Sequence, residues 1–147
     1  MQLKEQVKQD LISSLKAGDS LRSLTLRMLL AAMVNKEKEG KGEVTEDQLL
    51  EVVAAEAKKR REAAEAFAKG GRSEQALKEQ EELKVLLYYL PEQLSEQEIR
   101  DLVKEAVAKT GASSIKDMGK VMAHLAPQTK GRADGGKVSF VVKELLS

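Results

Sequence analysis

Five side chains between residues 116 and 132 could bind an anion. Lys116, Lys120 and His124 recur every four residues, and Lys130 and Arg132 follow closely. On a helix, a spacing of four residues stacks side chains on one face. We therefore expect Lys116, Lys120 and His124 to form a basic column that points to solvent, which Lys130 and Arg132 extend in the next loop. Such cations suit the phosphate and sugar oxygens of an RNA backbone.

The positive charge is local to this part of the chain. Residues 113–137 contain five Lys or Arg and two acids, whereas residues 1–90 contain sixteen of each. A lysine-rich helix face is usually only solvated, however. The pattern by itself therefore leaves RNA contact and a merely solvated surface as alternatives.

Other kinds of site fit these residues less well. A phosphate-cradling P-loop needs a strand, a glycine loop and a Lys-Ser or Lys-Thr pair at a helix start, and residues 116–138 lack that order. His124 shares its column with lysines and has no orienting carboxylate, so we expect a solvated or capping histidine rather than a catalytic base. With one histidine, no cysteine and dispersed acids, we expect no metal, no cofactor and no catalytic residue.

A second basic cluster spans residues 58–61, KKRR. Four consecutive helical residues point in four directions, and Glu56, Glu62 and Glu65 are close enough to pair with them. We expect a solvated helix face there rather than a single patch. The pair Tyr88 and Tyr89 could stack on a base, but more often such a pair plugs the end of a helical bundle.

The elements that position these groups are predicted to be helices. Charged residues make up 33% of the chain and aromatic residues 3%, which is typical of a helical protein with an ion-paired surface. The absence of cysteine excludes disulfides and thiolate sites and suits the cytoplasm. Neither a signal peptide nor a membrane span is recognisable, so we expect a cytoplasmic protein that does not enter a membrane.

Residues 1–90 are predicted to form an antiparallel bundle of four helices. The first ends at Ala17–Gly18, Asp19 caps the second, and a capping box at Thr45–Gln48 opens a third that runs to about Lys69. A fourth, capped by Ser73, stops at Leu90–Pro91. The second helix contains Leu21, Leu24, Met28 and Met33 together with the other apolar residues of the run SLTLRMLLAAMV. We therefore expect neighbours largely to surround it at the centre of the bundle.

Residues 91–147 are predicted to form a small unit of three helices. A capping box at Ser95–Glu98 opens a helix that ends at Thr110–Gly111, a second runs from about Ser114 to Ala126, and a third starts near Asp134. Met118, Val121, Met122 and Leu125 form the buried stripe of the middle helix. So small a core has limited stability, and we expect it to depend on the bundle or on a partner.

Three sequence runs closely resemble the GatB/YqeY family. They are GASSIKDMGKVMAHLAPQTKGRADGGKVSFVVKELL, the preceding YLPEQLSEQEI and the earlier KKRREAAEAFAKGGR. The resemblance implies a helical bundle followed by a three-helix domain. It also implies a relationship to the C-terminal part of the B subunit of aspartyl/glutamyl-tRNA amidotransferase, where this tail engages the tRNA elbow.

The family signature falls on residues 118–122 and 130–135. By resemblance, Lys120, Lys130 and Arg132 are the strongest candidates for RNA contact. One departure is the pair Gly135–Gly136, where a single glycine is the common form, so the start of the last helix is expected to be looser. The resemblance also points to a carbon–nitrogen ligase with glutamine as nitrogen donor, but the amidotransferase's catalytic regions lie outside the matched part.

Several functions from different classes remain open. The first is a stand-alone module that binds tRNA or another folded RNA and associates with an aminoacyl-tRNA synthetase or an amidotransferase. The second is a protein–protein adaptor whose basic corner meets an acidic partner. The third is an accessory subunit that assists a glutamine-dependent ligase in trans. Salt dependence of RNA binding separates the first from the second.

Overall fold

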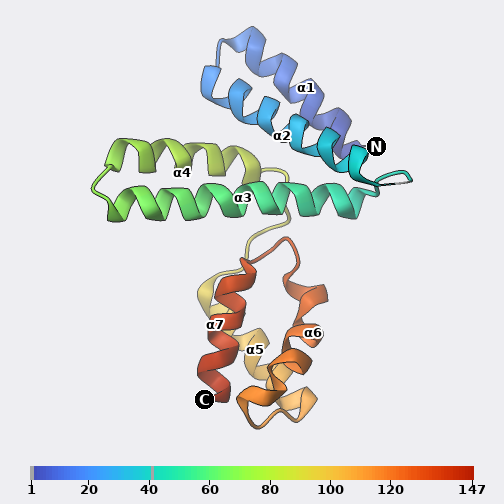
Figure 1. The fold of residues 1–147 in the computed structure, drawn as a ribbon, viewed down its shortest axis with the longest axis vertical. Helices are drawn as coiled ribbons and strands as arrows, with labels where there is room; N and C mark the ends of the chain where they lie inside the picture. The colour runs from blue at the N-terminus through green and yellow to red at the C-terminus, as the bar shows by residue number, and fades with distance from the viewer. Residues whose placement is uncertain (1, 41) are drawn as a thin grey trace. The chain divides into compact units, whose positions relative to one another are not determined.

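A computed structural model describes residues 2–40 and 42–147 of the chain. Over these residues the chain forms seven α-helices and one short 3-10 helix, without a strand (Figure 1). The predicted all-α class is therefore confirmed. The chain divides between Leu90 and Pro91 into two compact units, which we call the N-terminal unit and the C-terminal unit.

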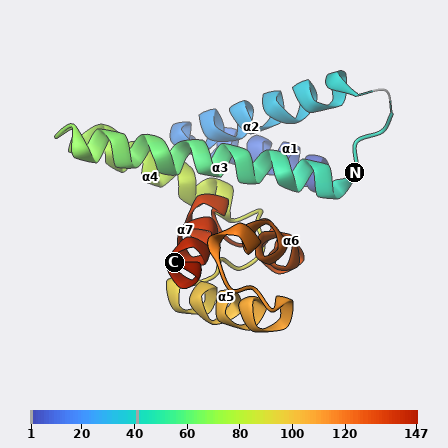
Figure 2. The same ribbon diagram turned by 60° about the horizontal axis from the view of Figure 1, so that its bottom comes forward.

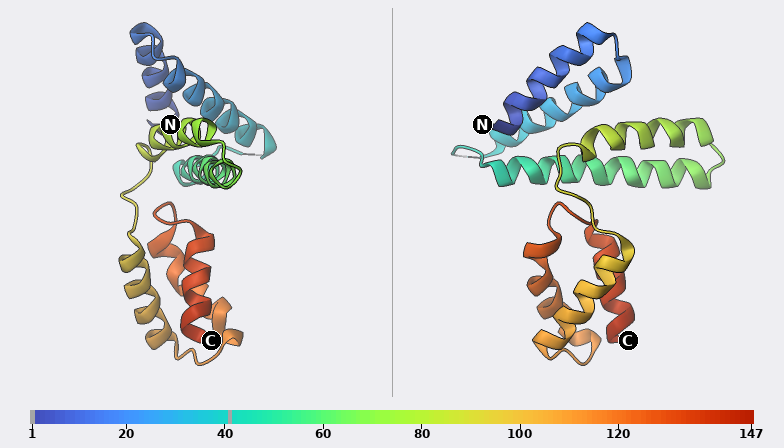
Figure 3. Two further views of the ribbon diagram at one scale, coloured as in Figure 1. Left: turned by 90° about the vertical axis from the view of Figure 1, so that its left-hand side faces the viewer. Right: turned by 180° about the vertical axis from the view of Figure 1, so that it is seen from behind.

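Two helical hairpins make up the N-terminal unit. Helices α1 (Gln2–Ala17) and α2 (Ser20–Glu39) form the first, and α3 (Glu46–Lys69) and α4 (Ser73–Leu87) form the second. The two hairpins lie at an angle to each other, as Figure 1 and the right panel of Figure 3 show. Helix α2 contacts each of the other three helices, and so does α3, so the two share the central position.

Local capping explains where α2 and α3 begin. Asp19 accepts a hydrogen bond from the backbone N–H of Arg22, and Thr45 and Gln48 form the predicted capping box. The prediction for Ser73 is wrong, because Ser73 is the first residue of α4 and its N-cap is Arg72, whose side chain forms no capping bond. Helix α4 thus begins one residue sooner than the sequence indicated, directly after the left-handed Gly71 (φ 74°) that closes α3.

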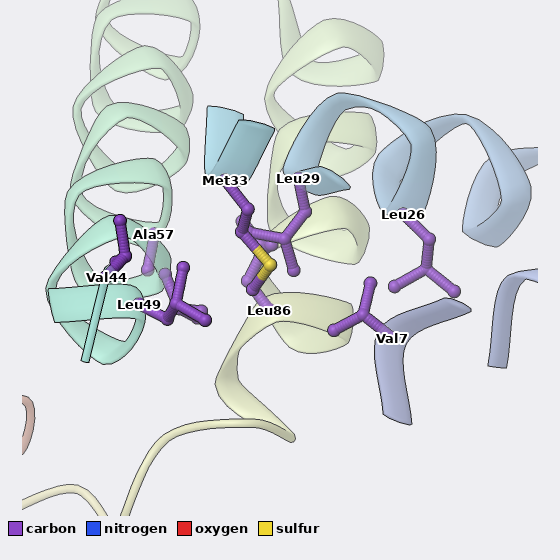
Figure 4. Close-up of a cluster of buried hydrophobic side chains, with 9 residues drawn as sticks. Val7, Leu26, Leu29, Met33, Val44, Leu49, Ala57 and Leu86 are labelled. Carbon is purple, nitrogen blue, oxygen red and sulfur yellow. The ribbon is translucent and has the colours of Figure 1, made fainter. Parts of the chain in front are cut away.

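The core of the N-terminal unit lies where the two hairpins cross. Leucines of α2 and α3 meet Val7 of α1 and Leu86 of α4, and Met33 fills the space between them (Figure 4). Leu26, Leu29 and Leu49 are at most 1% exposed. These contacts hold the hairpins together through the hydrophobic effect.

Helix α2 is central without being enclosed. Leu24 and Met28 are 44% and 41% exposed, so neighbours cover less of this helix than the sequence indicated. Its buried side chains include Leu26, Leu29 and Met33. The other hairpin and α1 cover only part of its circumference, which leaves the face of Leu24 open to solvent.

Arg60 corrects the prediction for residues 58–61. Lys59 pairs with Glu56 at 3.0 Å and Lys58 with Glu62 at 4.0 Å, as expected of a solvated face. Arg60, in contrast, is only 8% exposed. Its Nε lies 3.2 Å from a carboxylate oxygen of Glu82 on α4. One cation of this cluster is therefore buried between α3 and α4.

The C-terminal unit contains α5 (Glu96–Thr110), a 3-10 turn η1 (Ile115–Asp117), α6 (Met118–Thr129) and α7 (Gly135–Leu146). The three α-helices pack around one small core (Figure 2). Ser95 and Glu98 form the predicted capping box, and Gly111 ends α5 in the left-handed conformation. The shared core residues are Ile99, Val103, Ala106, Val121, Leu125, Val138, Val141, Val142 and Leu146.

The middle helix differs from its predicted bounds at both ends. Its first turn is the 3-10 turn η1, and α6 itself begins only at Met118. At the other end it continues past Pro127 to Thr129. Thr129 is buried and its hydroxyl donates to the carbonyl of Leu125 at 3.1 Å. Packing of this last turn overrides the tendency of Ala126, as the residue before proline, to leave the helix.

Candidate nucleic-acid interface

The predicted basic column is only partly regular. Lys120 and His124 lie one turn apart on α6, and both are exposed. Lys116 is also exposed, but it belongs to the 3-10 turn η1. A 3-10 turn advances three residues per turn instead of 3.6. Lys116 therefore does not continue the α-helical stacking of the other two, although all three side chains reach solvent.

Carboxylates lie beside this column. The first is Glu105 of α5, whose pKa is lowered mainly by its ion pair with Lys109 at 2.7 Å and less by the nearby His124. His124 thus affects Glu105 only through a minor electrostatic contribution, while Lys109 is the partner of that carboxylate. The sequence did not indicate this, because Glu105 and His124 belong to different helices.

The second carboxylate is Asp117, at the base of the column. Its side chain accepts a hydrogen bond from the backbone N–H of Ser113 at 2.9 Å. That bond is the main cause of the lowered pKa of Asp117, and Lys120 adds a smaller electrostatic contribution. Asp117 thus stabilises the turn before α6 as an anion and offsets part of the positive charge around Lys120.

The loop after α6, residues 130–133, forms hydrogen bonds with residues 91–94, the segment that enters the C-terminal unit. The backbone N–H of Leu94 donates to the carbonyl of Arg132 at 2.8 Å. The amide of Gln93 donates to the carbonyl of Gly131 at 2.8 Å and to that of Pro91 at 2.9 Å. Residues 91–94 are therefore bound along the loop 130–133.

Arg132 takes part in this contact with its side chain as well. Its Nε donates to the carbonyl of Glu92 at 3.2 Å, and its side chain is only partly exposed. Lys130 is exposed, and its backbone N–H caps α6 by donating to Ala126. Lys130 and Arg132 are the two loop residues predicted to contact RNA. Of these, Arg132 already uses its side chain to hold the segment around Glu92 in place.

The pair Gly135–Gly136 lies inside the last helix. Asp134 is the N-cap of α7, and its carboxylate accepts from the backbone N–H of Gly136 at 3.1 Å. This places the start of α7 as predicted. The carboxylate of Asp134 therefore serves as the N-terminal cap of α7.

Within residues 2–40 and 42–147, no three side chains of the metal-binding types come together in a group that could hold a metal ion. In the same described part of the chain, every helix is too short or too polar to cross a membrane. Of the five predicted site residues, Arg132 is partly exposed and donates to the carbonyl of Glu92, and the other four are exposed.

These features define an all-helical protein of two units, the second of which carries Lys120 and His124 exposed on α6 and a structured loop with Lys130 and Arg132. The profile of the Yqey-like protein family matches residues 4–146. The chain belongs to this family, as its sequence motifs predicted. No curated protein sequence matches the chain.

Proposed function

We propose that this protein is a stand-alone, non-catalytic module that binds tRNA, or another folded RNA, through its C-terminal unit. The contact residues are Lys116, Lys120, His124, Lys130 and Arg132, which we call the basic surface. A place in the cytoplasm beside an aminoacyl-tRNA synthetase or a tRNA-dependent amidotransferase is part of the same proposal.

The observation that carries this proposal is the exposure of the cations on α6 and η1. Lys116, Lys120 and His124 all face solvent, and Lys130 follows at the exposed end of the helix. Membership in the YqeY-like family supports it further, because the sequence resemblance includes a tRNA-binding tail. Phosphate contacts by lysine position a folded RNA and read its shape rather than its sequence.

The carboxylates of Glu105 and Asp117 bear on which kind of anion the basic surface can bind. Asp117 offsets part of the positive charge near Lys120, and Glu105 is paired with Lys109, so no single point here strongly attracts a small anion. A polyanion with many phosphates can contact several exposed cations at once and is the better match. Because these contacts would be mostly electrostatic, affinity should fall steeply as salt is raised.

The experiment measures fluorescence anisotropy of labelled total tRNA as a function of salt. The test variant replaces Lys116, Lys120 and Lys130 by glutamate, and the control replaces Lys58, Lys59 and Lys84, all exposed in the N-terminal unit. Both variants change the net charge equally. Arg132 and Arg60 are left out because each already holds part of the protein.

The test variant should bind far more weakly than the control, and its log–log salt slope should be flatter by about two to three units. Circular dichroism should show the same helicity for both. Equal binding by the two variants, or no salt-sensitive binding by the wild type, would rule out the basic surface as an RNA site. The adaptor function would then be the better explanation.

A further inference from the structure

Phe140 is a large aromatic side chain on the outer face of α7. It is 60% exposed, whereas Val138, Val141 and Val142 beside it in sequence are at most 4% exposed. At 100° per residue, Phe140 points directly away from the buried stripe that these valines form. Phenylalanine has no polar atom to hydrate, so its exposure carries a cost that Tyr or Trp would partly avoid.

The neighbours of Phe140 on the same face are not apolar. One turn before it are Gly136 and Lys137, and one turn after it are Lys143 and Glu144, all exposed. A face that receives a partner helix needs apolar residues at several of these positions. This face offers one ring between two cations, which is a poor match for an apolar protein partner.

The acids near the Phe140 ring already have partners within the protein, whereas the lysines near it do not form ion pairs with the described residues. Glu144 pairs with Arg100 of α5 at 2.9 Å. Asp134, at the start of the helix, caps the N–H of Gly136. Lys137 and Lys143 form no ion pair with the described residues. An anionic ligand therefore finds two available ammonium groups, about 4.5 Å along the helix axis on either side of Phe140.

We propose that Phe140 is a stacking platform for an unpaired RNA base, with Lys137 and Lys143 contacting the phosphates on either side of it. This inference rests on the proposed RNA-binding function and adds a second surface of the C-terminal unit to it. Single-stranded loops of folded RNA are recognised by stacking bases on exposed aromatic rings, and every base has a face that can stack. The platform selects RNA that has an accessible unpaired base over continuous duplex.

The chain contains no tryptophan, so Phe140→Trp introduces a single fluorescent reporter at the platform. Tyr88→Trp is the matched control, because Tyr88 is also an exposed aromatic residue, 71% exposed, in the N-terminal unit. Both variants are titrated with total tRNA and with a blunt-ended RNA duplex. The control corrects for light absorbed by the RNA.

Total tRNA should quench Trp at position 140 saturably and leave Trp at position 88 unchanged. The duplex should bind through phosphate contacts without quenching. Phe140→Ala should weaken tRNA binding by about 5- to 150-fold with an unchanged salt slope, and Phe140→Tyr should bind like the wild type. A Lys137→Gln, Lys143→Gln variant should instead flatten the slope.

The two proposals fail in different ways. If Phe140→Ala binds tRNA as tightly as the wild type while binding remains salt-sensitive, the platform is wrong and the RNA-binding function stands. Contact with a protein partner would then be the better explanation for the exposed ring of Phe140. If the wild type shows no salt-sensitive tRNA binding, both proposals fall together.

Discussion

The Nε of Arg132 donates a hydrogen bond to the backbone carbonyl of Glu92 over 3.2 Å. Forty residues separate the two in sequence, and the bond joins the loop after α6 to the segment that enters the C-terminal unit. A residue whose charge suggests an RNA contact is therefore also part of the internal structure. Its two roles can be separated by mutation.

Arg132→Ala should remove this bond and loosen residues 92–94, at a cost of about 1 kcal/mol in the free energy of unfolding. Hydrogen exchange at the amide of Leu94, which donates to the carbonyl of Arg132, should become faster. Lys130→Ala is the control, since it keeps the Arg132 side chain in place. Identical exchange at Leu94 in both variants would show that the side chain does not hold the segment.

Arg60→Ala should be strongly destabilising. Arg60 is 8% exposed and Glu82 is 5% exposed, with 3.2 Å between Nε and the carboxylate. Removing the guanidinium leaves a buried carboxylate without its partner, which costs about 3–5 kcal/mol. Chemical denaturation should report this loss.

The matched control for Arg60 is Lys58→Ala on the same helix. Its ion pair with Glu62 is exposed and 4.0 Å long, so it should change stability by less than about 1 kcal/mol. Similar losses in the two variants would contradict the structural difference between them.

Glu79 should make the N-terminal unit less stable as the pH rises. Burial and the neighbouring carboxylate of Glu82 raise the pKa of Glu79, although Arg60 opposes them. The folded state then holds this proton more tightly than the unfolded state does. The resulting stabilisation is complete below the ordinary pKa of 4.5 and is lost as the pH rises through the higher pKa of the folded state.

Glu79→Gln keeps the shape of the side chain and removes its titration. Melting temperatures of the wild type and the variant, measured from about pH 4 to 7, should therefore diverge as the pH rises, with the variant becoming the more stable. Parallel curves across this range would mean that Glu79 has the same proton affinity in both states.

Tyr89→Phe should weaken the attachment of α1 to the end of α4. The Tyr89 hydroxyl donates to a carboxylate oxygen of Asp10 at 2.5 Å, and burial with this bond raises the pKa of Tyr89. A hydrogen bond to a charged group contributes about 1.5–3 kcal/mol. Tyr88→Phe removes a hydroxyl from a side chain that is 71% exposed and should be nearly neutral. Equal denaturation midpoints for the two variants would count against this bond.

Local features of the chain were predictable from sequence. The capping boxes at Thr45–Gln48 and Ser95–Glu98 and the cap at Asp19 depend on atoms within three residues of one another. For that reason the number, order and approximate bounds of the helices followed from residue types and spacing. The predicted cap at Ser73 was the exception. The excess of positive charge in residues 113–137 was also predictable, because it follows from counting residue types.

The tertiary structure decided which cations are available. Arg60 and Lys59 are neighbours in sequence, yet α4 covers the first and leaves the second in solvent. Helical spacing gives the direction of each side chain around its own helix, but not which helix lies there. Arg132 and Glu92 likewise meet only after the chain folds, because their hydrogen bond depends on a distance in space. Whether a charge faces solvent, a carbonyl or a carboxylate is thus a property of the packed helices and not of the sequence pattern.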